Sequence, residues 1–245
     1  MTTIAIIPAR LASTRFPGKV LASATGKPLI QHVWENARRA ASLSRVVIAT
    51  DHPRVRDACA GFGAEVVMTR EDHPNGSSRL AEAAAALGLA PTDIVVNVQG
   101  DEPETEPGVV DAAVAVLQRS GAEVATVASP FASGEDPENP NIVKVVLRAD
   151  GCALYFSRSL IPYPRVAGAA TVLRHVGLYV YRAEFLRLYP TLVPTPLERA
   201  ESLEQLRVLE HGFRIAVATA ECHGAGIDTP EQYEAFVRRV GGGAR

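Results

Sequence analysis

The chain has 245 residues, of which 47% are hydrophobic and 21% charged. No apolar run approaches the ~18 residues that a membrane-spanning helix needs, so we expect a globular protein without membrane insertion. The 25 Lys and Arg residues nearly balance 27 Asp and Glu, which argues against a nucleic-acid partner. The length suits one large α/β core, and we expect residues 1–245 to form a single domain.

Cysteine usage and the start of the chain predict a cytoplasmic protein. Cys59, Cys152 and Cys222 are odd in number and widely spaced, which fits neither a disulfide framework nor a paired zinc motif. The apolar residues 4–7 have no basic stretch before them and no small-residue cleavage site after them. We therefore expect free thiols and no secretory signal.

Short β-branched runs alternate along the chain with segments of helical apolar spacing, which is typical of βα units around a mostly parallel sheet. The predicted strands are residues 3–8, 45–50, 65–68, 93–99, 124–128, 142–147, 153–157, 175–181 and 215–219. The predicted helices are residues 28–41, 53–62, 77–87, 109–118, 197–210 and 230–240.

The predicted fold is α/β, with a Rossmann-like sheet to which the later strands make a small antiparallel addition. Those late strands and helices could serve dimerisation or acceptor binding. The polar loop 129–141 could instead mark a domain boundary, although the strands after it would need a sheet to join.

The loop after the first strand concentrates positive charge. Residues 8–19 contain Arg10, Arg15 and Lys19 together with two hydroxyl side chains and one glycine. Arg can grip phosphate oxygens in bidentate fashion, and Lys adds a compact point charge. Val20 follows Lys19, so this is no Walker A motif, and the glycines of a Rossmann fingerprint are missing. By composition alone, a polyphosphate site and a solvated basic loop both stay open.

Acidic residues follow the predicted strand 93–99. That strand ends in Gly100, Asp101, Glu102 and Pro103. Ligands of open α/β sheets bind at the carboxyl ends of the strands. An acidic pair at this place is hard to explain by packing alone, so Asp101 is a candidate functional residue.

The basic loop resembles the signature of sugar nucleotidyltransferases. Residues 6–15, with Pro17, Gly18 and Lys19, resemble the version in the 3-deoxy-manno-octulosonate (KDO) cytidylyltransferase family. Further segments match that family in the same order over nearly the whole chain: residues 49–51, 97–103, 139–141, 143–146, 153–158, 161–162, 174–179, 203–207 and 226–230.

The resemblance implies a CTP site built on the basic loop. It makes Lys19, Arg15 and Asp101 the catalytic residues, with Arg10, Arg15 and Lys19 on the CTP phosphates. The nucleotide-binding residues that it implies are Pro8, Ala9, Arg10, Arg15, Lys19, Asn75, Gly76, Ser77, Arg79 and Gln99.

Residues 73–79 resemble the base-recognition loop of the family, with two departures. The usual serine-glycine-threonine core is replaced by Asn75, Gly76 and Ser77, and Ser78 stands where an acidic residue is common. Both departures fall in the part of the nucleotide site that would select cytosine. The same residues also suit an ordinary turn and helix N-cap, and this alternative stays open.

By the resemblance, Asp101 and Asp228 are the carboxylates that hold Mg²⁺. The chemistry agrees, because Mg²⁺ prefers oxygen ligands and usually binds one or two carboxylates plus substrate phosphates. Without the resemblance, Asp228 would be interpreted as a helix N-cap before Thr229 and Pro230.

The resemblance also implies an acceptor site for a sugar acid. Such a molecule carries a carboxylate and several hydroxyls, so it needs a cation and bifunctional polar groups. Taken alone, His175 would be a structural histidine and Glu204 a solvated helix position. The acceptor residues implied are Gln99, Arg158, His175, Tyr179, Glu204 and Gln205.

The expected reaction is attack of the anomeric hydroxyl of KDO on the α-phosphorus of CTP, giving CMP-KDO and pyrophosphate. Positioning and charge neutralisation drive such transfers. The resemblance further implies a homodimer and a product that feeds lipopolysaccharide synthesis. Two alternatives remain: the same transfer to 8-amino-KDO, another sugar acid or a phosphonate, and a non-catalytic nucleotide-binding protein on this fold.

Overall fold

The central feature of the computed structural model is a mixed sheet with the strand order β3-β2-β1-β4-β8-β5-β9, to which the hairpin β6-β7 is joined through β8. The structure describes residues 1–13, 15–73, 75–166, 168–224 and 226–242. The strands are Thr3–Ala9 (β1), Arg45–Thr50 (β2), Glu65–Met68 (β3), Ile94–Asn97 (β4), Val124–Pro130 (β5), Lys144–Leu147 (β6), Ala153–Ser157 (β7), Leu173–Arg182 (β8) and Ile215–Thr219 (β9).

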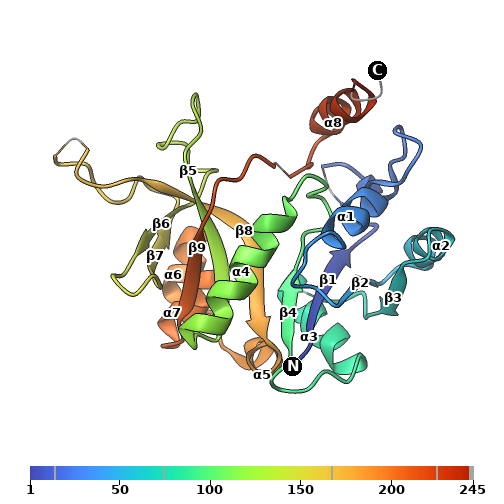
Figure 1. The fold of residues 1–245 in the computed structure, drawn as a ribbon, viewed down its shortest axis with the longest axis horizontal. Helices are drawn as coiled ribbons and strands as arrows, with labels where there is room; N and C mark the ends of the chain where they lie inside the picture. The colour runs from blue at the N-terminus through green and yellow to red at the C-terminus, as the bar shows by residue number, and fades with distance from the viewer. Residues whose placement is uncertain (14, 74, 167, 225, 243–245) are drawn as a thin grey trace.

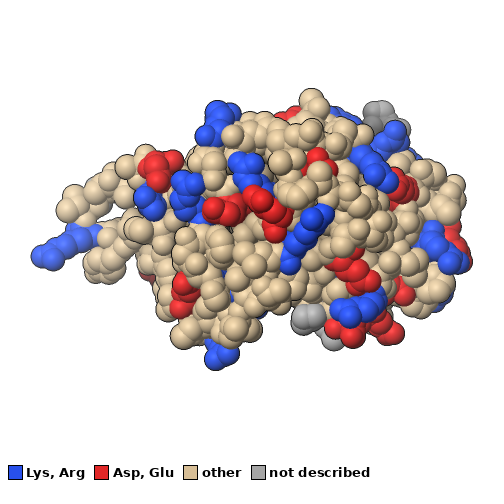
Figure 2. All heavy atoms as spheres, turned by 90° about the horizontal axis from the view of Figure 1, so that it is seen from below, with Lys and Arg blue, Asp and Glu red and all other residues tan. Residues whose placement is uncertain are grey.

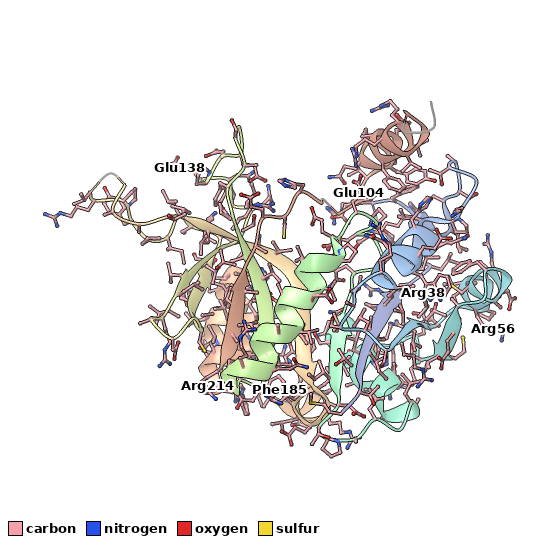
Figure 3. The ribbon with its side chains drawn as sticks, viewed as in Figure 1. Arg38, Arg56, Glu104, Glu138, Phe185 and Arg214 are labelled. Carbon is pink, nitrogen blue, oxygen red and sulfur yellow. The ribbon has the colours of Figure 1, made fainter. Side chains whose placement is uncertain are left out.

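Helices cover both faces of the sheet (Figure 1). The helices are Leu29–Ala37 (α1), Pro53–Gly61 (α2), Gly76–Ala86 (α3), Pro107–Ser120 (α4), Ala183–Leu188 (α5), Pro196–Glu201 (α6), Gln205–Glu210 (α7) and Pro230–Gly242 (α8), with short 3₁₀ turns at Lys19–Leu21 (η1) and Tyr189–Thr191 (η2). Apolar residues of α1, α2 and α4 form one core, and those of α3, α5 and α7 form a second core on the opposite face. Phe185 of α5 lies in this second core and is labelled at the bottom of the view in Figure 3.

Local sequence explains how several elements begin and end. All four residues of β4 are buried, as expected for a strand covered on both faces. Helix α2 begins with Pro53 at its first position, and the side chain of His52 accepts a hydrogen bond from the Arg54 amide. Helix α4 ends at Gly121, whose φ of 65° is left-handed and suits glycine.

The strand order brings two loops together at the carboxyl end of the sheet. β1 pairs in parallel with both β2 and β4, so the chain reverses its direction of travel across the sheet at β1. Such a switch point leaves a crevice between the loops that follow the neighbouring strands. Here these are the basic loop after β1 and the acidic segment after β4.

The mostly parallel α/β fold is confirmed, and several element predictions need correction. The predicted helix 197–210 is two helices, because Ser202 between α6 and α7 adopts a left-handed φ of 52°. The first helix ends at Ala37 rather than residue 41, and α5 was not predicted. β8 is part of the main sheet, antiparallel to β4 and β5, whereas β9 runs parallel to β5.

The strands on the two sides of loop 129–141 belong to the same sheet, since β5 and β6 both pair with β8. Within the described ranges, every helix falls short of the length and apolar character that crossing a membrane requires.

Candidate active site

A cavity of about 620 Å³ opens at the carboxyl ends of β1 and β4. The basic loop, the segment after β4, the start of α3 and the residue before α8 contribute to its wall. Its lining residues are Pro8, Arg10, Ala12, Ser13, Arg15, Pro17, Lys19, Val20, Asn75, Gly76, Arg79, Gln99, Gly100, Asp101 and Asp228.

Lys19 joins two carboxylates that are distant in the sequence. Its Nζ lies 2.6 Å from Asp101 Oδ2 and 2.9 Å from Asp228 Oδ1, and it donates a third hydrogen bond to the Ile227 carbonyl at 3.0 Å. The Ile227 amide in turn donates to the Asp101 carbonyl at 2.9 Å, which fixes the segment before α8 against the segment after β4. Three chain segments therefore meet at one ammonium group.

The electrostatics of this cluster keep Lys19 charged. Burial opposes the charged form, but the hydrogen bonds and charges of Asp101 and Asp228 outweigh it and raise the pKa of Lys19. Glu102 follows Asp101 in the chain, and burial and the charge of Asp101 raise its pKa to about 7. The carboxylates that face the cavity are thus Asp101 and Asp228.

Gly100 lets the segment after β4 approach the end of β1. A Cβ atom at Gly100 would lie 2.6 Å from the Pro8 carbonyl oxygen, which is closer than real contacts allow. The absence of a side chain at Gly100 is therefore required for Asp101 to sit beside the basic loop.

The arginines of the basic loop are available to solvent. Arg10 is exposed, and the Arg15 side chain is 65% exposed while its Nη2 lies 2.8 Å from Asp228 Oδ2. Ala9, predicted to contact nucleotide, is buried in the core at the end of β1 and is not among the cavity-lining residues. Thr14, part of the basic-loop motif, lies outside the described residues.

The start of α3 supplies another wall of the cavity. Asn75 is the N-cap of this helix, because its Oδ1 accepts a hydrogen bond from the Ser78 amide at 2.9 Å. Arg79 lines the cavity but is 1% exposed, with Nη2 at 2.6 Å from Asp51 Oδ2 and Nη1 at 2.5 Å from Thr69 Oγ1. Arg79 therefore anchors α3 to the ends of β2 and β3. Pro74, predicted as part of this loop, lies outside the described residues.

A second cavity of about 290 Å³ adjoins the first and shares Gly76 and Gln99 with it. It lies over β4 and β8, beside the break between α6 and α7. Its wall is formed by Gly76, Ser77, Asn97, Gln99, Val124, Tyr179, Tyr181, Tyr189, Ser202, Leu203, Glu204, Gln205 and Val208. Four of the six residues predicted for the acceptor are among them: Gln99, Tyr179, Glu204 and Gln205.

The other two predicted acceptor residues make structural contacts. The Arg158 guanidinium donates to the carbonyls of Glu201 at 2.7 Å, Pro140 at 3.0 Å and Ser202 at 3.4 Å, so it holds the end of α6. His175 is hydrogen-bonded to Thr126 Oγ1 at 2.9 Å, and burial lowers its pKa to about 4. Neither residue is among those lining the two cavities.

Sequence reasoning missed several residues that line these cavities. Asn97 is the last residue of β4, two positions before Gln99, and its buried Oδ1 has no hydrogen-bond partner among the described residues. Tyr181 and Tyr189 were also missed. Period-two spacing from Gln99 and from Tyr179 could have found Asn97 and Tyr181, but Tyr189 follows the unpredicted α5 and carried no such signal.

The comparisons with known proteins agree with this geometry. Residues 4–215 match the model of the cytidylyltransferase family, which defines the class of protein. A 3-deoxy-manno-octulosonate cytidylyltransferase of Syntrophobacter fumaroxidans is 50% identical over 240 residues, covering 97% of this chain and 96% of that protein. A 3-deoxy-manno-octulosonate cytidylyltransferase of Pseudomonas fluorescens is 51% identical over 247 residues, covering 96% of this chain and 97% of that protein. The chain belongs to the 3-deoxy-manno-octulosonate cytidylyltransferase family.

Solved structures extend the comparison to the fold. A CMP:2-keto-3-deoxy-manno-octonic acid synthetase complexed with CTP superposes with a TM-score of 0.93 at 40% identity, covering 99% of this chain and 100% of that one. A cytidylyltransferase of Leptospira borgpetersenii gives a TM-score of 0.64 at 17% identity, covering 98% of this chain and 87% of that one. At this identity the match supports the fold alone.

Proposed function

We propose that this protein transfers CMP from CTP to the anomeric hydroxyl of KDO, releasing pyrophosphate. The observation that carries the proposal is the pair of adjoining cavities: one is lined by Lys19, three arginines and two carboxylates, and the other by tyrosines and amides. The first has the chemistry of a nucleoside triphosphate site and the second that of a hydroxyl-rich acceptor. The names of the relatives favour KDO over 8-amino-KDO, other sugar acids or a phosphonate.

In this proposal the cations of the first cavity hold the triphosphate. Arg10 and Arg15 are accessible for bidentate contacts with phosphate oxygens, and Lys19 offers a point charge at the cavity floor. As the anomeric oxygen bonds to the α-phosphorus, the bond from that phosphorus to the bridging oxygen breaks. The acceptor proton goes to solvent, and the cations stabilise the charge of the departing pyrophosphate.

Gln99 has the place of a positioning residue between the two substrates. It lines both cavities, and its Nε2 donates to the Gly177 carbonyl at 3.5 Å. A side chain in this position can orient the acceptor against the α-phosphate, and such alignment contributes strongly to bimolecular transfers.

Asp101 and Asp228 fit the requirements of Mg²⁺. No group of three or more His, Cys, Asp and Glu side chains in the described residues could hold a metal by itself. Two carboxylates that face a phosphate-sized cavity nevertheless match an ion that completes its shell with substrate oxygens and water. When bound, the ion would neutralise phosphate charge and polarise the α-phosphate for attack.

A single experiment tests the proposed reaction. Pyrophosphate release would be measured with Mg²⁺ while CTP, UTP, ATP and GTP are crossed with KDO, 8-amino-KDO, sialic acid and a small phosphonate. Release with CTP and KDO is expected. Preferential use of another acid would show that KDO is not the acceptor. No pyrophosphate release in any combination would favour the alternative of a non-catalytic nucleotide-binding protein.

We further propose a single-domain protein that acts as a homodimer. Support comes from exposed apolar side chains on β7 and on the segment between β7 and β8, which projects from the sheet (Figure 1): Leu154 is 62%, Tyr163 83% and Val166 66% exposed. Light scattering should then give about twice the 26.1 kDa chain mass. A monomer at assay concentration would contradict the dimer.

The proposed setting is the cytoplasm, where CTP is made, with the product entering lipopolysaccharide synthesis. The face seen in Figure 2 has acidic and basic side chains interspersed, which gives no support to a nucleic-acid partner. Fractionation of cells that express the protein would test the location.

A further inference from the structure

His73 lies between the loop that leaves β3 and helix α3. Its side chain is only 4% exposed. Its Nε2 contacts Glu82 Oε2, and its Nδ1 lies 3.1 Å from Ser78 Oγ. One imidazole ring therefore joins the loop to two successive turns of the helix.

The hydrogen bonds define which atoms donate. Ser78 Oγ has a single hydrogen, and it donates to the Asn75 carbonyl at 2.9 Å. Ser78 Oγ can then only accept from His73 Nδ1, while the Glu82 carboxylate only accepts from Nε2. Both ring nitrogens of His73 therefore face oxygen atoms that can accept a hydrogen bond.

Glu82 also holds the beginning of the same loop. Its Oε1 and Oε2 accept from the Arg70 amide at 3.2 and 3.3 Å. Burial opposes the charged form of Glu82, but the hydrogen bonds from His73 and from the Arg70 amide outweigh it and lower the pKa of this carboxyl. The carboxylate thus fixes the loop at two points, Arg70 and His73.

A third cavity borders the loop and the start of α3. It has a volume of about 580 Å³, and its lining includes His73, Asn75 and Glu82 together with Tyr189 and Arg207. Asn75 lines both this cavity and the nucleotide cavity. Two hydrogen bonds with Ser78 contribute to its position: Asn75 Oδ1 accepts from the Ser78 amide, and the Asn75 carbonyl accepts from Ser78 Oγ.

We propose that His73, paired with Glu82, is a positioning residue for nucleotide selection: it holds Asn75 and Gly76 where they meet the base of CTP. This proposal rests on the proposed function, because its test measures the kinetics of CMP transfer. His73 itself makes no contact with substrate in this proposal. It explains how a loop that departs from the family pattern at Asn75, Ser77 and Ser78 can keep a defined shape, since Ser78 accepts the second hydrogen of His73.

The test compares His73→Gln and Glu82→Gln with a control, His211→Gln, in the full-length protein. His211 is exposed at the end of α7 and is not among the residues that line either cavity. In His73→Gln the KM for CTP should rise about tenfold and the preference for CTP over UTP should narrow, because one charge-assisted hydrogen bond is lost. kcat and the KM for KDO should stay within about twofold. Glu82→Gln should shift the same constants by a smaller factor.

Calorimetric titration with CTP separates this inference from the proposed function. Binding of CTP by the unmodified protein without turnover of KDO would overturn the acceptor assignment alone, and the Kd for CTP would then replace KM as the readout. Absence of CTP binding would overturn both. Folded variants whose CTP constants equal those of the control, or whose kcat and KDO constants fall as much as their CTP constants, would overturn the role of His73.

Discussion

Lys19 Nζ lies 2.6 Å from Asp101 Oδ2 although 82 residues separate them, and this contact defines the floor of the nucleotide cavity. It places one cation and one carboxylate where a triphosphate and its counter-ion would meet. The same ammonium contacts Asp228, so each carboxylate is held by a group that can also contact phosphate.

Asp101→Asn should abolish most turnover without unfolding the protein. The amide keeps the shape of the side chain but removes the charge that binds a cation, and we expect kcat to fall by about 10²-fold or more. Because Asp228 still pairs with Lys19, the melting temperature should change by only a few degrees, on the order of 1 kcal/mol. Asp57→Asn, at an exposed position on α2, is the control. Normal turnover in Asp101→Asn would refute the metal assignment.

Gly100→Ala should damage both stability and nucleotide binding. The added methyl group would lie 2.6 Å from the Pro8 carbonyl, so the ends of β1 and β4 must separate. We expect a loss of about 1–3 kcal/mol in the free energy of unfolding, measured by urea denaturation, and a higher KM for CTP. Gly108→Ala in α4 is the matched control, since its methyl group meets open space. Equal behaviour of the two variants would contradict the close approach.

Substitutions in the second cavity should change acceptor binding alone. Tyr179→Phe removes a hydroxyl from its wall, and Glu204→Gln replaces a carboxylate oxygen that can only accept with an amide nitrogen that can only donate. We expect the KM for KDO to rise about tenfold in each case while the KM for CTP stays unchanged, because each hydrogen bond contributes about 1–1.5 kcal/mol. Steady-state kinetics with each substrate varied in turn would measure this, with the surface variant Glu184→Gln as control. An equal rise in both KM values would argue against separate subsites.

The ion pair of Glu198 with Arg207 predicts a pH dependence of stability. Burial opposes the charge of Glu198, but hydrogen bonds from Arg207, at 2.8 Å from Nε, and from the Thr195 amide outweigh it and lower its pKa. A carboxyl whose pKa is lowered on folding stabilises the protein above its unfolded pKa, near about 4.3, and this stabilisation is lost as pH falls through the folded value.

Glu198→Gln should therefore be less stable than the unmodified protein at neutral pH, by about 1–3 kcal/mol. The difference should shrink as pH falls below the unfolded pKa of the carboxyl, near about 4.3, and through its lowered folded pKa. The difference in stability would be measured from the melting temperatures of both proteins between about pH 3 and pH 8, a range that starts below the usual carboxyl pKa and ends where the carboxyl is fully ionised. A gap between the two proteins that does not depend on pH would contradict the assigned charge state.

Much of the fold follows from local sequence. The bounds of β2, β3, β7 and β9 were predicted to the residue, because runs of β-branched or aromatic residues mark these strands. The break at Ser202 was not predicted, since the apolar spacing continues through it and only a left-handed φ ends α6. The position of β8 between β4 and β5 also carried no local signal, because strand order is decided by contacts between distant segments.

The sequence by itself determined the chemistry of this protein: the cations of residues 8–19, the acidic residues after β4 and the order of the family motifs. Only the tertiary structure decided which of these groups meet. It brought Lys19 to Asp228 across 209 positions, directed Arg158 to the carbonyls of Pro140, Glu201 and Ser202, and joined the two cavities through Gln99. The reason is physical: residue type sets what a group can do, whereas its partners depend on how distant strands pair and pack.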